Sequence, residues 1–378
     1  MTQLARLRIF SACLATAILF WTIALCKGPD VYRLPQPVHR TFASIDVTVS
    51  PGIELMSIVQ TISTYPKVFG FLMTKDSSRY KEDVLKSFSA LKEHPAVKLF
   101  EKLAFRPRML NFSAPSAILL YADENLNLRN DLRFDQFILS RAGGKDTLAL
   151  LFRLLQDFAR ESAFNSFYEK HTNLYMRMVS NTIETMDSTD TIHELEAFYG
   201  AKLKSYTMNL APLYSFVGYG NSIVHDNGAR EAYITLGPQV VKENVPSFGN
   251  RLYLRWMTRH EFSHPYVNPL TEKYWDLIKA DSAKYDSIPG NAKRGVCGDW
   301  QECIDEFTIR AITTSLAYRD GEQEGAFFEA KEKSKGVSNL DALRSELRVY
   351  ETNRALYPTF DSFFPKILRV FKNQTITP

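Results

Sequence analysis

Residues 251–270 read RLYLRWMTRHEFSHPYVNPL, and the five letters HEFSH at 260–264 decide the fold class that we expect. Side chains four positions apart project from one face of a helix, so His260 and His264 can offer two imidazole nitrogens to one Zn²⁺ ion. Glu261, beside the first histidine, can reach a water at the metal and act as a general base. In a chain with seven histidines, such a string would arise by chance on the order of 0.01 times, which weighs against the alternative of two ordinary histidines on a helix face.

The residues after the motif limit where a third metal ligand can come from. Pro265 disfavours helical backbone at the residue before it, which predicts that the motif helix ends at His264. No glycine and histidine follow at the spacing of the metzincins, so that class is excluded. Because no histidine at all follows His264, a downstream carboxylate is the expected third ligand, in a site of two histidines and one glutamate.

A downstream segment rich in carboxylates, CGDWQECIDEFTIRA at 297–311, is the source that we expect for this ligand. Asp299 followed by Glu302 is the pattern of a helix N-cap and its capping partner. With Glu302 turned back to the cap, Glu306 one turn later is free to reach the metal, and we predict it as the third ligand. Glu302 itself and Asp305 are the alternatives.

The motif and its surroundings carry a resemblance to a known family. The strings that carry it are RHEFSHPYVNPL, DEFTIRA, FARESAFNSFYEKHTNLY, FYG at 198–200 and YETNRALYPTFDSFFP. They resemble a family of uncharacterised secreted bacterial proteins, of the domain-of-unknown-function kind, that are zincin-like. The resemblance covers most of residues 40–370 and implies a gluzincin-type metallopeptidase. It implies metal ligation by His260, His264 and Glu306, with Glu261 as the base.

Three further side chains and one strand are candidates for roles around the metal. Arg310 lies four residues after Glu306 and could orient or neutralise it, although an ordinary exposed arginine is an equally good interpretation. The oxyanion of the transition state needs a donor across the metal; Tyr266 and Tyr318 are candidates, with simple packing as the alternative for each. By analogy with zincins, the strand EAYITLG at 231–237 is expected to be the edge strand that lies antiparallel to the substrate.

The start of the chain has the composition of an export signal. Two arginines precede the uncharged run IFSACLATAILFWTIALC, which is typical of a secretory signal peptide, although its length also suits a retained membrane anchor. Its last residue, Cys26, could carry a lipid. We therefore expect a periplasmic, extracellular or membrane-attached protein. In that oxidising setting the two remaining cysteines, Cys297 and Cys303, are expected to form a disulfide.

The pattern along the chain predicts a helix-rich, zincin-like α+β protein with a small, mostly antiparallel sheet next to the HExxH helix. Apolar residues at helical spacing predict a helix at 95–104, and alternation predicts strands at 44–49 and 231–236. The expected organisation is a signal peptide or anchor at 1–26, a linker at 27–40, a mostly helical part at 41–200 and a catalytic part at 201–378, with 41–378 as one continuous domain.

Composition narrows the function that we expect. Lysine and arginine number 46 against 42 acidic residues and are spread without blocks, which argues against a nucleic-acid binder. The expected function is that of a secreted metallopeptidase that holds one Zn²⁺ per chain and acts on a peptide or protein substrate. Two alternatives stay open: a zinc-containing surface or binding protein without turnover, and a zinc hydrolase of a non-peptide amide.

Overall fold

The computed structural model describes residues 31–106, 110–186 and 190–373. The expected leader, with its possible lipid at Cys26, lies outside these ranges. Contacts between residues gather Leu34–Pro378 into one compact unit. Within the described ranges, no helix combines the length and the apolar character that a membrane span requires.

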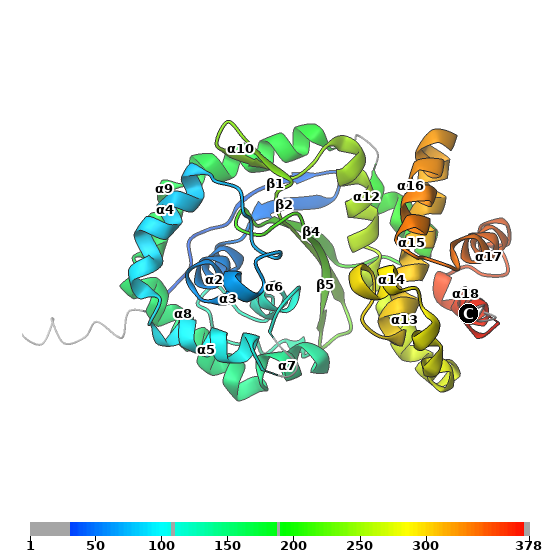
Figure 1. The fold of residues 1–378 in the computed structure, drawn as a ribbon, viewed down its shortest axis with the longest axis horizontal. Coiled ribbons are helices and arrows are strands. Elements are labelled where there is room, and N and C mark those ends of the chain that lie inside the picture. Colours follow the sequence, from blue (N-terminus) through cyan, green and yellow to red (C-terminus); the bar gives the residue numbers. More distant parts are fainter. Residues whose placement is uncertain (1–30, 107–109, 187–189, 374–378) are drawn as a thin grey trace, which may run out of the picture. The chain divides into compact units, whose positions relative to one another are not determined.

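A six-stranded sheet lies at the centre of this unit (Figure 1). The strand order across it is β1 (Val38–Phe42), β2 (Ile45–Val49), β4 (Ser205–Leu210), β6 (Arg230–Leu236), β5 (Gly218–His225) and β3 (Leu132–Arg133). β2, β4 and β6 run parallel to one another, and the other three pairings are antiparallel. The sheet is therefore mixed, with three antiparallel and two parallel pairings, and its six strands exceed the small sheet that we expected. A separate hairpin joins β7 (Val240–Lys242) to β8 (Val245–Ser247).

The parallel pairing of β2 with β4 comes from a long crossover. β1 and β2 form an antiparallel hairpin, and the chain then runs through helices before β4 aligns beside β2. Parallel strands need such a crossover, because a short turn can only reverse the chain. The alternating pattern at 44–49 therefore predicted a strand correctly, but it contained no sign that the partner strand comes after residue 200.

Most of the helices that precede β4 bury their apolar faces in one core, whereas the last of them, α11 (Thr191–Tyr199), packs against helices that follow the sheet. In α8, for example, the buried residues Leu148, Leu151, Phe152 and Leu155 recur at helical spacing. These helices are α2 (Pro51–Ile62), α3 (Tyr65–Val68), α4 (Arg79–Phe88), the 3₁₀ turn η1 (Ser89–Leu91), α5 (Pro95–Ala104), α6 (Ala114–Leu119), α7 (Gln136–Ala142), α8 (Lys145–Glu161), α9 (Phe164–Lys170), α10 (Thr172–Thr185) and α11 (Thr191–Tyr199). Figure 1 shows α2, α3 and α6 on one side of the sheet.

The helices that follow the sheet lie on its other side (Figure 1). Among them α15 is central, because it packs against α12, α13, α16 and α17. They are α12 (Arg251–Glu261), α13 (His264–Lys273), the 3₁₀ helices η2 (Trp275–Leu277) and η3 (Lys279–Ser287), α14 (Gly290–Gly295), α15 (Trp300–Asp320), α16 (Glu322–Ser334), α17 (Leu340–Thr352) and α18 (Phe360–Lys372).

The strand expected at the sheet edge lies inside the sheet. β6 pairs along its length with β4 on one side and with β5 on the other, so it has no free edge for a substrate. The reason is that β5 and β3, which both precede β6 in the chain, are added beyond it in the sheet. In the described part of the chain, β3 pairs only with Val224 and His225, so the outer edge of β5 from Gly218 to Ile223 carries no partner strand.

Candidate metal centre

The HEFSH motif spans a break between two helices. α12 ends at Glu261 and α13 begins at His264, so the prediction of one helix that ends at His264 is wrong in its boundary. Pro265, in the first turn of α13, has no N–H to donate to the carbonyl of Glu261. Gly220 of β5 packs against that same carbonyl, so the hydrogen-bond pattern of α12 stops there and a new helix begins.

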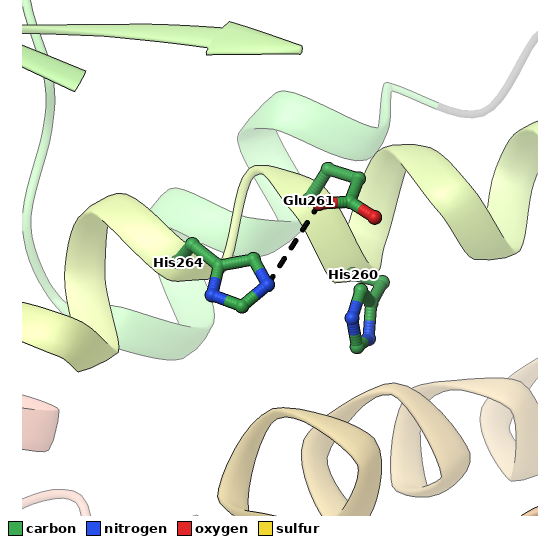
Figure 2. A group of neighbouring side chains, drawn as sticks. All are labelled: His260, Glu261 and His264. Atoms are coloured by element: carbon green, nitrogen blue, oxygen red, sulfur yellow. Dashed lines mark ion pairs between the residues drawn. The ribbon is translucent and has the colours of Figure 1, made fainter. Parts of the chain in front are cut away.

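Despite the break, His260, Glu261 and His264 lie together (Figure 2). One ligand atom from each lies within 4.8 Å of the others. Nε2 of His264 is 3.7 Å from Oε2 of Glu261, and the centroids of the two imidazole rings are 5.2 Å apart. All three side chains are buried or nearly so, which gives the cluster a site largely withdrawn from solvent.

Glu306 of α15 reaches this cluster from the neighbouring helix. Its Oε2 lies 3.5 Å from Nε2 of His260, and its Oε1 lies 3.5 Å from Nε2 of His264. Two ligands that share a tetrahedral Zn²⁺ at about 2.1 Å are roughly 3.4 Å apart, so each of these two separations, one to each oxygen of Glu306, is that of a pair of ligands on one ion. The donor set, two imidazole nitrogens and one carboxylate, is also that of a catalytic zinc site.

Charges around the cluster keep the Glu306 carboxylate ionised. Burial alone would raise its pKa, but Arg310 and the two histidines hold the pKa of Glu306 well below its usual range. Conversely, burial would lower the pKa of His264, and the carboxylates of Glu306 and Glu261 raise it above its ordinary value. An ionised carboxylate is the form that a metal ion requires.

Asn268, which the sequence reasoning missed, orients one of the histidines. Its Oδ1 lies 3.1 Å from Nδ1 of His264, so an Nδ1–H can donate a hydrogen bond to it. The lone pair of Nε2 then faces Glu306. The position of Asn268 four residues after His264, on the same face of α13, was the signal in the sequence that could have identified it.

Neither of the two other carboxylates considered as third ligand forms an ion pair with the histidines in the described part of the chain. Glu302 accepts from the backbone N–H of Gly298 at 2.6 Å, while its own N–H donates to the N-cap Asp299 at 2.8 Å. Asp305 is buried, and this burial raises its pKa to about 7. Among the described residues, the ion pairs with His260 and His264 come from Glu261 and Glu306.

Comparison with known proteins places the chain in a family. A family model described as a domain of unknown function, DUF4932, matches residues 45–370. The chain belongs to the DUF4932 family. No curated protein and no solved structure matches it. The DUF4932 match includes the strands of the central sheet from β2 to β6 and all the residues of the candidate metal centre.

The structure does not bring the two predicted oxyanion donors of this DUF4932 protein to the cluster. The hydroxyl of Tyr266 lies 2.5 Å from that of Tyr206, and its ring stacks on Tyr199 with centroids 4.2 Å apart. Tyr318 lies twelve residues beyond Glu306 and therefore about 18 Å further along α15. Its hydroxyl donates a hydrogen bond to Glu329 at 2.7 Å. Both side chains have packing partners of their own.

The remaining predicted residues lie at the start and middle of α15. Cys297 and Cys303 are joined by a disulfide just where the helix begins. Arg310 is buried, and its Nε and one NH2 group lie 3.0 and 2.9 Å from Oε2 of Glu306. It is therefore not an exposed helix arginine, and its guanidinium contacts the carboxylate that it was expected to orient.

Proposed function

We propose that this DUF4932 protein is a zinc-dependent hydrolase of peptide bonds, zincin-like and of the gluzincin type. The observation that carries the proposal is the position of Glu306, whose two carboxylate oxygens each lie 3.5 Å from an Nε2 of the histidine pair. Such a convergence from three separate helices, with a glutamate next to the first histidine, is the donor arrangement of a catalytic rather than a four-ligand structural zinc site.

Each residue then has a distinct role. When bound, Zn²⁺ supplies a Lewis acid that activates a water and polarises a carbonyl group. His260, His264 and Glu306 hold the ion, and Arg310 keeps the Glu306 carboxylate in place. Glu261 points into the same cluster without being needed as a fourth ligand, so its carboxylate can take a proton from the attacking water.

The open edge of β5 supports a peptide as the substrate. Gly218 lies so close to Glu261 that a Cβ there would be 2.8 Å from its Oε1. From this point the edge runs to Ile223 without a partner strand in the described part of the chain. An extended peptide that added itself to this edge would pass beside the proposed base. β5 thus takes the role that the analogy with zincins had assigned to the strand at 231–237.

Two observations support an exported protein. The apolar run that ends at Cys26 is typical of a secretory signal or an anchor. The disulfide between Cys297 and Cys303 is of the kind that persists in an oxidising compartment. We therefore propose that the protein acts in the periplasm, outside the cell or at a membrane surface.

The deciding experiment is the Glu261→Gln substitution. It keeps the size of the side chain and leaves all three proposed ligands intact, so zinc content and melting temperature should stay close to those of the wild type. Cleavage of a mixed peptide library should fall by about 10²-fold or more. Glu322→Gln, at an exposed position that opens α16, is the matched control and should leave the rate unchanged.

Three outcomes would contradict the proposal. Wild-type protein that holds zinc but cleaves no peptide would instead be a binding protein or a hydrolase of another amide. A Glu261→Gln variant that retains the full peptidase rate would show that the proposed base is wrong. Peptidase activity that survives complete removal of zinc by a chelator would exclude the metal from the reaction.

A further inference from the structure

A chain of buried ion pairs connects Glu306 to helix α16. Arg310 binds Oε2 of Glu306 through Nε and one NH2 group, and its other terminal nitrogen donates to Oε2 of Glu332 at 2.6 Å. Glu332 is completely buried, and Lys335 pairs with its second oxygen at 3.1 Å. The buried guanidinium thus has one carboxylate at the metal centre and one on α16.

A second path connects His260 to the same helix through aromatic rings. The imidazole stacks on Trp256 with a centroid distance of 4.9 Å and an interplanar angle of 16°. Trp256 in turn stacks on Phe328 at 5.8 Å and 8°. Unlike His264, which has Asn268, His260 has no hydrogen-bond partner for its buried Nδ1 in the described part of the chain. Besides the contact of its Nε2 with Glu306, the orientation of this ring therefore depends on the stack.

Both paths end on one face of α16. Phe328 and Glu332 are four residues apart in that helix, so their side chains project from the same face. This face is buried at both positions. A single helix thereby contacts the residues that support two separate ligands. The HEFSH motif by itself does not require a helix at the position of α16.

We propose that Glu332 and Phe328 are positioning residues for the metal centre. Glu332 holds Arg310, so that the guanidinium keeps Oε2 of Glu306 and leaves Oε1 directed at His264. Phe328 holds Trp256 against the ring of His260. The inference rests on the proposed zinc site, but it concerns metal binding and is independent of peptide cleavage.

The charges explain why Glu332 matters to Glu306. A guanidinium with a single anionic partner would neutralise that carboxylate and weaken it as a metal ligand. With two carboxylates on opposite sides, Arg310 shares its charge between Glu306 and Glu332, while Lys335 balances the second carboxylate. Removing the charge of Glu332 would therefore let Arg310 rotate and would also draw Glu306 more strongly toward the guanidinium.

The test compares Glu332→Gln with Glu329→Gln by zinc affinity. Glu329 lies on the same helix and also forms ion pairs, with Lys333 and Arg344, whereas the ion pairs of Arg310 among the described residues are with Glu306 and Glu332. Competition with a chromophoric chelator should give a Kd for Zn²⁺ that is 10- to 100-fold weaker in Glu332→Gln, as is typical when a partner of a ligand is lost. Glu329→Gln should stay within about twofold of the wild type. The visible spectrum of bound Co²⁺ should change in the first variant alone.

A double-mutant cycle separates positioning from a general loss of structure. If Glu332 acts through Arg310, then Glu332→Gln should have little further effect on Zn²⁺ affinity in an Arg310→Met background. Additive effects in folded variants, or an unchanged Kd in Glu332→Gln, would overturn the inference. If Glu332→Gln does not fold, Phe328→Leu tests the second path. An unchanged Kd for Zn²⁺ in Phe328→Leu would also overturn the inference. Wild-type protein that binds no Zn²⁺ would instead contradict the proposed function itself.

Discussion

The α-carbon of Gly220 in β5 packs directly against the carbonyl oxygen of Glu261. A Cβ at position 220 would lie 2.2 Å from that oxygen and 3.0 Å from Cδ2 of His264. Position 218, two residues earlier on the same face of the strand, would bring a Cβ within 1.9 Å of Met257. The sheet thus touches the break between α12 and α13 through glycines, and this contact holds the proposed base and one metal ligand close to the open edge of β5.

Gly220→Ala should therefore disturb both stability and metal binding. The methyl group has no room beside backbone atoms, so we expect the free energy of unfolding to fall by about 1–3 kcal/mol and the affinity for Zn²⁺ to fall with it. Urea unfolding and chelator competition measure the two effects. Gly295→Ala is the control, because a Cβ there meets no atom within 4 Å. A Gly220→Ala variant that behaves like this control would contradict the close packing described here.

Glu306→Ala should remove most of the zinc affinity. The substitution takes away a carboxylate that faces both histidines, so the affinity for Zn²⁺ should fall by more than about 100-fold. This decrease is larger than the one expected when a residue outside the ligand set is removed. Metal analysis after dialysis against a weak chelator measures it. Glu302→Ala, which alters only the cap at the start of α15, should retain about one Zn²⁺ per chain. Full zinc in Glu306→Ala would disprove its assignment as third ligand.

Reduction of the disulfide should destabilise the start of α15. The bond closes a short loop from Cys297 to Cys303, and loss of this constraint on the unfolded chain is expected to lower the free energy of unfolding by about 2 kcal/mol. Urea midpoints with and without reductant measure the difference. The double variant Cys297→Ser/Cys303→Ser should unfold at the reduced midpoint and show no response to reductant. Two reactive thiols in the unfolded, unreduced wild type would contradict the pairing.

A buried carboxyl group in α2 should make stability depend on pH. Glu54 is 1% exposed and accepts a hydrogen bond from the hydroxyl of Tyr80, which also lies 2.8 Å from that of Tyr175. Burial raises the pKa of Glu54 from 4.5 to about 7, although the hydrogen bond from Tyr80 lowers it in part. Between these two pKa values the folded protein binds more protons than the unfolded chain, so stability falls as pH rises through this window.

Glu54→Gln should abolish that contribution. The difference in unfolding free energy, wild type minus variant, should decrease by roughly 3 kcal/mol between pH 4 and pH 8, with most of the change between pH 4.5 and 7. Urea unfolding of both proteins at a series of pH values measures it, and titrating groups common to both cancel in the difference. A difference that stays constant across this range, or that increases with pH, would show that Glu54 is ionised in the folded state.

Local patterns identified the features that depend on neighbouring residues. Apolar spacing predicted a helix over 95–104, which agrees with α5, and alternation predicted strands that agree with β2 and β6. The boundary of the motif helix was missed, because the break depends on Gly220, a residue on a different element that packs against the last carbonyl of α12. Pro265 indicated an end at His264, three residues after the observed end at Glu261.

The sequence by itself determined that His260, Glu261 and His264 lie together, since five consecutive residues cannot separate far whether they form one helix or the junction of two. Only the tertiary structure decided that Glu306 faces both histidines, that β6 lies inside the sheet and that Glu332 contacts Arg310. The physical reason is that spacing along a helix is set by the covalent chain and its local hydrogen bonds. Which helix or strand packs beside another depends on the burial of apolar faces over the whole molecule, and no short stretch of sequence encodes that.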